Sequence, residues 1–251
     1  IDAPMYYVAL MTFVLIFSSV TMVLAVDAGH HMQKSKVTFY MLLTVIGGAI
    51  FVGSQAWEWK NFIKGEYGAL ETKGGQILQF VNADTGKRAA IQEFAQGIDS
   101  PRTTHQLSNG IWYKSETSLP TVSLAEVNKG FAATSNLVIR TEQLDEKGRK
   151  VVLSRAESLL KIQDATIVVE GANLIRNEYG NRLFADFFFF ITGFHGFHVF
   201  SGVVINIIIF FNVIVGTYER RGHYEMVEKV GLYWHFVDLV WVFVFTFFYL
   251  V

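Results

Sequence analysis

Four long runs of apolar residues interrupt an otherwise mixed pattern of hydrophobic and polar positions. Each run is long enough to cross a bilayer as a helix, because a hydrocarbon core about 30 Å thick needs roughly 20 residues. Buried core helices of a soluble protein are the alternative, but such helices usually keep one polar face, whereas the third run is apolar nearly all round. The pattern predicts an all-α membrane protein with a four-span transmembrane helical bundle. The runs are Met5–Val26, Val37–Ala56, Phe187–Val215 and Val230–Val251.

Most charged residues lie between the second and third runs, in a polar segment covering residues 65–182. Loops longer than about 12–15 residues usually have structure or function of their own. Two stretches predict β-hairpins, one turning at Asp84–Gly86 and one at Glu146–Gly148, and the stretch 166–175 predicts a strand that pairs with either hairpin. His105 is the only histidine of the segment, and a lone surface histidine is more often inert than a ligand. We therefore expect a β-rich extramembrane insert that serves as an interaction module.

The insert shows no metal-spacing motif, Gly-rich phosphate loop or nucleophile elbow. The predicted divisions are 1–64 (spans one and two), 65–182 (the insert) and 183–251 (spans three and four).

The basic residues of the two short connections indicate how the spans are oriented. Lys34 and Lys36 lie in the first connection, and Arg220, Arg221 and Lys229 in the third. With four spans these two connections share one side of the membrane, which the positive-inside rule assigns to the cytoplasm. We therefore expect a multi-pass protein of the cell (inner) membrane, with the insert and both termini on the outer, periplasmic side.

Composition excludes several functions. Hydrophobic residues make up 51% of the chain and charged residues 17%, against roughly 25% charged in an ordinary soluble domain. The net charge of −1 gives no reason to expect a nucleic-acid partner, which usually needs a concentrated basic face. The chain has no Cys, which excludes disulfides, thiolate metal sites and a cysteine nucleophile.

Ionisable side chains within the spans are candidates for a functional site, because a charge at mid-bilayer costs roughly 2.5–3.5 kcal/mol. No Lys or Arg lies deep in any span, so these groups must be neutral, paired with one another, or bonded to backbone or water. The ionisable positions are Glu58 near the outer end of span two, His195 and His198 in span three, and His235 and Asp238 in span four.

Helical spacing groups these positions by face. His195 and His198 are three residues apart, as are His235 and Asp238, so each pair is expected to share a helix face. Trp234 is expected on the face of Asp238, and small residues beside the histidines allow a second helix to approach closely. These small residues are Gly193, Gly196 and Gly202.

Three roles are open for these groups: hydrogen bonds that fix helix packing, contacts with lipid headgroups or a proton path, and ligation of a metal or haem. A haem with two histidine ligands needs imidazoles at matching depth on facing helices, whereas His195 and His198 share one helix and His235 lies nearer the inner surface. Copper would need three converging histidines, or Cys and Met. We therefore predict no catalytic residue, metal site or haem site in this chain.

The spans carry a recognisable set of motifs. The segments FFFFITGFHGFHVFSG (187–202) and YWHFVDLVWVFVFTFFYL (233–250) resemble the last two spans of subunit III of haem-copper cytochrome oxidases. QAWEW (55–59) and AGHHMQKSK (28–36) resemble the end of the preceding span and the connection before it. The four matches occur in the family's order and leave the insert unmatched.

The resemblance implies a helical bundle beside the catalytic subunit I of an aa3-type cytochrome c oxidase, which reduces O₂ to water and pumps protons. Members of the family hold no haem or copper, which belong to partner subunits I and II. They bind phospholipid, stabilise subunit I and support its proton uptake in aerobic electron transport. The positions that the resemblance identifies as recurrent intramembrane polar residues are Glu58, His195, His198, Trp234, His235 and Asp238.

This chain departs from the family in three respects. Most members have five or seven spans, and only the last four are matched. Many have an arginine near the inner end of the TGFHG span, where this chain has Asn212. The connection that holds residues 65–182 is usually short, so we expect the insert to dock a neighbouring electron-donating complex or a cytochrome.

Other functional classes explain less of the sequence. The main alternative is a stand-alone membrane scaffold or transporter with an outer binding module. A transporter typically shows internal repeats and broken helices at mid-membrane, and neither is evident. A b-type cytochrome ranks third, because the histidines do not form a haem site.

Overall fold

The computed structural model describes residues 4–97, 107–108, 112–113, 120–173 and 175–249. The chain divides into two compact units. The helical unit consists of Ile1–Glu58 together with Phe188–Val251, and the sheet unit is Trp59–Phe187. His105, which was expected to be a lone surface histidine, lies outside the described residues.

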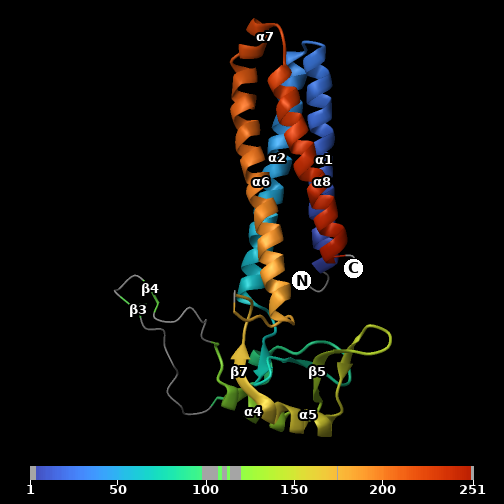
Figure 1. The fold of residues 1–251 in the computed structure, drawn as a ribbon, viewed down its shortest axis with the longest axis vertical. Helices are drawn as coiled ribbons and strands as arrows, with labels where there is room; N and C mark the ends of the chain where they lie inside the picture. Colours follow the sequence, from blue (N-terminus) through green and yellow to red (C-terminus); the bar gives the residue numbers. More distant parts are fainter. Residues whose placement is uncertain (1–3, 98–106, 109–111, 114–119, 174, 250–251) are drawn as a thin grey trace. The chain divides into compact units, whose positions relative to one another are not determined.

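Each of the four apolar runs is a long helix, and Figure 1 shows these helices running side by side in the helical unit. All four are long and apolar enough to cross a membrane. Their bounds are α1 Pro4–His30, α2 Lys34–Lys64, α6 Arg182–Ile214 and α8 Glu225–Tyr249, with the short α7 at Thr217–Arg221 between α6 and α8.

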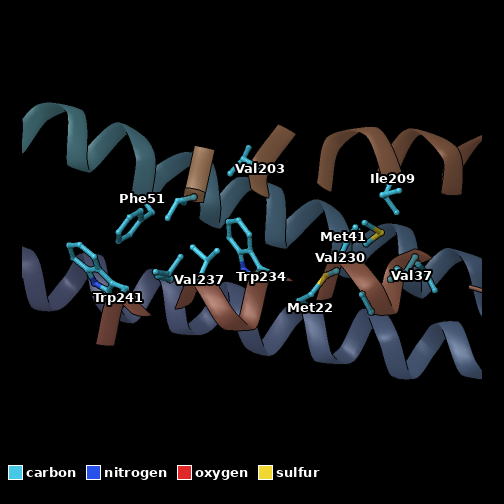
Figure 2. Packing of buried hydrophobic residues seen from close by; sticks show 14 of the residues in the cluster. Met22, Val37, Met41, Phe51, Val203, Ile209, Val230, Trp234, Val237 and Trp241 are labelled. Atoms are coloured by element: carbon cyan, nitrogen blue, oxygen red, sulfur yellow. The ribbon is translucent and has the colours of Figure 1, made fainter. Parts of the chain in front are cut away.

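Large apolar side chains occupy both the interior and the exterior of the helical unit. Trp234 and Trp241 of α8 pack with Phe51 of α2 in the interior, where none is more than 1% exposed (Figure 2). On the exterior, Phe190 and Phe197 of α6 are 71% and 67% exposed. Such a contiguous apolar exterior is rare on soluble monomers and suits contact with lipid or with other apolar helices.

The sheet unit is built on a five-stranded antiparallel sheet with the strand order β6-β5-β2-β1-β7. The strands are β1 Ala69–Thr72, β2 Ile77–Asn82, β5 Leu137–Leu144, β6 Lys150–Val152 and β7 Ala165–Val169. A separate pair consists of β3 Leu107–Ser108 and β4 Trp112–Tyr113.

The short helices α3 and α4 supply residues to the core on one face of this sheet. Phe94 and Phe131 lie against Phe80 of β2, and Ile139 of β5 belongs to the same buried cluster. Capping boxes, in which a serine and a glutamate bond each other's backbone, begin α4 and α5. The helices are α3 Ile91–Phe94, α4 Leu124–Ala133 and α5 Arg155–Lys161, and the 3-10 turn Ile162–Asp164 follows α5.

The structure confirms the hairpin predicted at Glu146–Gly148, which is formed by β5 and β6. The chain also reverses at Asp84–Gly86, although its return arm pairs only through the single bridge between Val81 and Arg88. The pairing predicted for residues 166–175 was wrong. Their strand, β7, pairs with β1, a strand of four residues that begins at Ala69, shortly after the end of α2 at Lys64, and that the sequence pattern did not reveal.

Candidate functional site

Two buried tryptophans of α8 donate hydrogen bonds to hydroxyl groups of α1. The Trp234 Nε1 atom lies 3.1 Å from Ser18 Oγ, and the Trp241 Nε1 atom lies 2.9 Å from Thr12 Oγ1. The two indoles are seven positions apart, which is close to two helical turns, so they lie on one face of α8. Because each indole N–H finds an acceptor away from water, the bonds fix the register of α1 against α8.

His235 contacts a third hydroxyl group of α1, that of Ser19. The Ser19 Oγ atom lies 2.6 Å from His235 Nδ1. The Asp238 Oδ1 atom is buried without a hydrogen-bond partner among the described residues. One member of the predicted pair, His235, is therefore bonded to a serine of another helix.

The two histidines of α6 lie in different surroundings. The His195 Nε2 atom lies 3.0 Å from the carbonyl oxygen of Val237, so this nitrogen donates and carries the proton. The His195 ring is buried between Phe51 and Trp241, and its Nδ1 atom has no partner among the described residues. His198 bonds the carbonyl oxygen of Phe194 through Nδ1 and is partly exposed. Although a shared helix face was expected, the two imidazoles do not form one site.

Glu58 joins α2 to α8. The Tyr249 hydroxyl donates to Glu58 Oε1 over 2.8 Å, and the Gln55 Nε2 atom donates to Glu58 Oε2 over 2.8 Å. Both carboxyl oxygens therefore have a neutral donor, and no ion pair involving Glu58 occurs within the described residues. Glu58 is separate from the cluster around Ser19, so the predicted residues form several interhelical contacts and not one pocket.

The predicted packing glycines differ in how much space surrounds them. A Cβ atom added to Gly202 would lie 3.0 Å from the Trp234 ring, and one added to Gly48 would lie 2.6 Å from it. At Gly196 the nearest atom would be 4.0 Å away, which is an ordinary contact. Gly193 lies on α6 and is partly exposed. Gly202 and Gly48 therefore allow the close approach around Trp234, and sequence reasoning missed Gly48.

Sequence reasoning also missed the partners of the predicted residues. Thr12, Ser18 and Ser19 of α1 and Tyr249 of α8 supply the hydroxyl groups described above. The available signal was the presence of polar side chains within an apolar run, on one side of α1. Within the described residues, no group of three or more His, Asp and Glu side chains is arranged to hold a metal ion. The chemistry that these side chains can perform is therefore hydrogen bonding between helices.

Comparison with known proteins identifies the carboxyl-terminal part of the chain. Residues 173–251 match the family model described as cytochrome c oxidase subunit III. A probable cytochrome c oxidase subunit 3 of Rickettsia conorii is 43% identical over 75 residues, which are 29% of this chain and 26% of that protein. The cytochrome c oxidase subunit 3 of Thermostichus vulcanus is 38% identical over 79 residues, which are 29% of this chain and 37% of that protein.

A third similar protein is the cytochrome c oxidase subunit 3 of Synechocystis sp., 43% identical over 70 residues, which are 28% of this chain and 30% of that protein. This chain thus spans between 26% and 37% of the length of these three curated relatives. The matched segment includes α6 and α8 with their motifs, whereas the motifs at 28–36 and 55–59 precede it. Over residues 173–251, the chain is therefore similar to cytochrome c oxidase subunit III.

Proposed function

We propose that the chain is the non-catalytic subunit III of an aa3-type haem-copper cytochrome c oxidase. The observation that carries the proposal is that the family match of residues 173–251 contains the buried groups that join α8 to α1 and α6. These groups form interhelical bonds, which suits a subunit that maintains a helical surface for its neighbours. In this role the chain stabilises subunit I, binds phospholipid against its apolar exterior, and supports proton uptake by the redox core.

The proposed arrangement has α1, α2, α6 and α8 crossing the membrane, with residues 65–182 on the periplasmic side as a docking module. Four helices of sufficient length and apolarity support it, as do the basic residues of the short connections. The partners are oxidase subunits I and II and phospholipid, and the docking module receives a neighbouring electron-donating complex or cytochrome.

The orientation is testable with single cysteines, because the chain has none of its own. In spheroplasts, a membrane-impermeant maleimide is expected to label Lys73→Cys, which replaces an exposed residue of the sheet unit. The exposed position of Arg221→Cys is expected to react only after the membrane is permeabilised. Labelling of Arg221→Cys alone in sealed spheroplasts would reverse the orientation.

The oxidase assignment is tested by affinity purification of the tagged chain in mild detergent, followed by a reduced-minus-oxidised spectrum. We expect haem a bands and O₂ consumption in the eluate, both supplied by co-purified subunits. A chain that elutes without haem, under conditions that keep a known oxidase intact, would favour a scaffold or transporter. Haem b bound to the isolated chain would instead indicate a b-type cytochrome.

A further inference from the structure

The sheet of the sheet unit has a second face, opposite the face that forms the core. Because side chains alternate along a strand, Leu137 and Ile139 of β5 enter the core whereas Val138 and Arg140 lie on the other face. Part of that face is covered by the segment before α6, since the Gln79 side chain donates to the carbonyl oxygen of Glu178 over 2.9 Å. Beside this contact lies a groove of about 390 Å³, lined by residues of β2, β5 and β6.

Arg140 and Lys150 both line this groove. Among the described residues, no carboxylate oxygen lies within 4.0 Å of either cation. The Arg140 Nε and Nη2 atoms both donate to the neutral Gln79 Oε1 atom, over 3.1 and 2.7 Å. The Lys150 Nζ atom donates to the carbonyl oxygen of Tyr179 over 3.1 Å. Both cations are therefore held in position by uncharged acceptors.

This arrangement is electrostatically costly without an anion. Burial lowers the pKa of the Lys150 ammonium, and the guanidinium groups of Arg140 and Arg88 lower it further. Burial also lowers the pKa of the Arg140 guanidinium. The carboxylate of Glu142 raises the pKa of Lys150, but it also accepts a hydrogen bond from the backbone N–H of Ile77. An anion in the groove would relieve the repulsion between the cations.

The shape of the groove indicates the kind of anion. Val81 and Val138 are buried at its base, and Val152 at its edge is 50% exposed. An apolar base is of little use to an inorganic ion, and small-molecule sites usually enclose most of their ligand. A groove this open, beside the edge strand β6, suits one segment of a larger partner.

We propose that this groove is the docking site for an acidic segment of a partner protein, whose carboxylates pair with Arg140 and Lys150 while its apolar atoms cover the exposed Val152. The inference rests on the proposed role of residues 65–182 as a docking module and specifies the surface and the charge of the partner. Arg149, which also lines the groove, is already paired with Asp145 over 3.1 Å, so it is not counted among the cations that the partner's carboxylates would pair with.

The test uses the full-length chain in detergent and a fluorescent peptide of alternating Glu and Ala. Fluorescence anisotropy is expected to show binding that weakens as salt is added, and no binding of a peptide with Gln in place of Glu. The double variant Arg140→Gln with Lys150→Gln is expected to bind about tenfold more weakly or worse, because hydrogen bonds to charged groups are lost. Lys129→Gln removes an exposed cation from α4 and is expected to leave the affinity unchanged.

Cross-linking places the peptide on the molecule. A benzophenone attached to Val152→Cys is expected to capture the Glu peptide, whereas one attached to Lys129→Cys is not. Capture at both positions, or equal affinity of the double variant and the wild type, would overturn the proposal. So would displacement of the peptide by inorganic phosphate at equal concentration and constant ionic strength, because it would indicate a small-anion site.

Failure here is separable from failure of the oxidase assignment. The double variant leaves the helical unit unchanged, so it is expected to co-purify with the same haem-containing subunits as the wild type. If the double variant loses peptide binding but still co-purifies with these subunits, the loss is caused by the change in the groove.

Discussion

Replacing Glu178 by Gln is expected to destabilise the sheet unit by about 3–6 kcal/mol, because hydrogen bonds to a charged acceptor are each worth roughly 1.5–3 kcal/mol. Glu178 is 0% exposed, and its carboxylate accepts four backbone N–H groups. They belong to Glu66 and Tyr67 on Oε1 and to Gly68 and Gly171 on Oε2, over 3.3, 3.1, 3.0 and 2.7 Å. A glutamine keeps one oxygen and turns an NH₂ group toward two of these donors.

Hydrogen exchange of the intact chain measures this effect, since it reports opening of the sheet unit without requiring that unit to fold alone. Backbone amides of β1 and β7 are expected to lose protection in Glu178→Gln. Glu146→Gln, at an exposed position of the β5–β6 turn, is the matched control and is expected to change stability by no more than about 0.5 kcal/mol. Unchanged protection of β1 and β7 in Glu178→Gln would contradict the structural role of the carboxylate.

Replacing Trp234 by Ala is expected to destabilise the helical unit by about 3–5 kcal/mol, the usual cost of deleting a buried tryptophan side chain. The indole is 1% exposed, lies close to Gly48 and Gly202, and donates to Ser18. Its removal leaves a cavity lined by residues of α1, α2 and α6, the helices that contribute Ser18, Gly48 and Gly202. Thermal unfolding in detergent, followed by helical circular dichroism, measures the loss.

Trp57→Ala is the matched control for this substitution. Trp57 is 42% exposed and contacts Tyr7 with ring centroids 4.9 Å apart, so its removal is expected to have a much smaller effect. Trp234→Phe retains most of the packing and loses the bond to Ser18, so its stability should lie between Trp234→Ala and the wild type. A Tm for Trp234→Ala no lower than that for Trp57→Ala would contradict the packing described here.

The long helices were predictable because their length and apolarity carry the signal without tertiary information. The β5–β6 hairpin was predictable because its turn is encoded locally, with Gly148 in the left-handed conformation at φ 72°. The strand β1 was not predictable, since four residues give too short a pattern of alternation. Its pairing with β7 joins segments far apart in the sequence, which periodicity does not encode.

The sequence indicated which residues to consider for the site, but it did not indicate how they are arranged in space. His195 and His198 are three positions apart, which leaves an angular offset of about 60° around the helix, and this offset separates a buried imidazole from a partly exposed one. The polar side chains of α1 were visible within the apolar run but did not reveal their partners, because such hydroxyl groups often bond their own helix, as Thr12 also does to the carbonyl oxygen of Val8. The role of Glu178 depends on four backbone groups that converge only in the folded chain.

Native mass spectrometry of the affinity-purified complex, released from its detergent micelle in the gas phase, tests the central claim most directly. The account predicts one copy of this chain in a single assembly with haem-copper oxidase subunits I and II, with bound phospholipid as an added mass. Detection of the chain only by itself, or only with proteins unrelated to the oxidase, would contradict its assignment as subunit III.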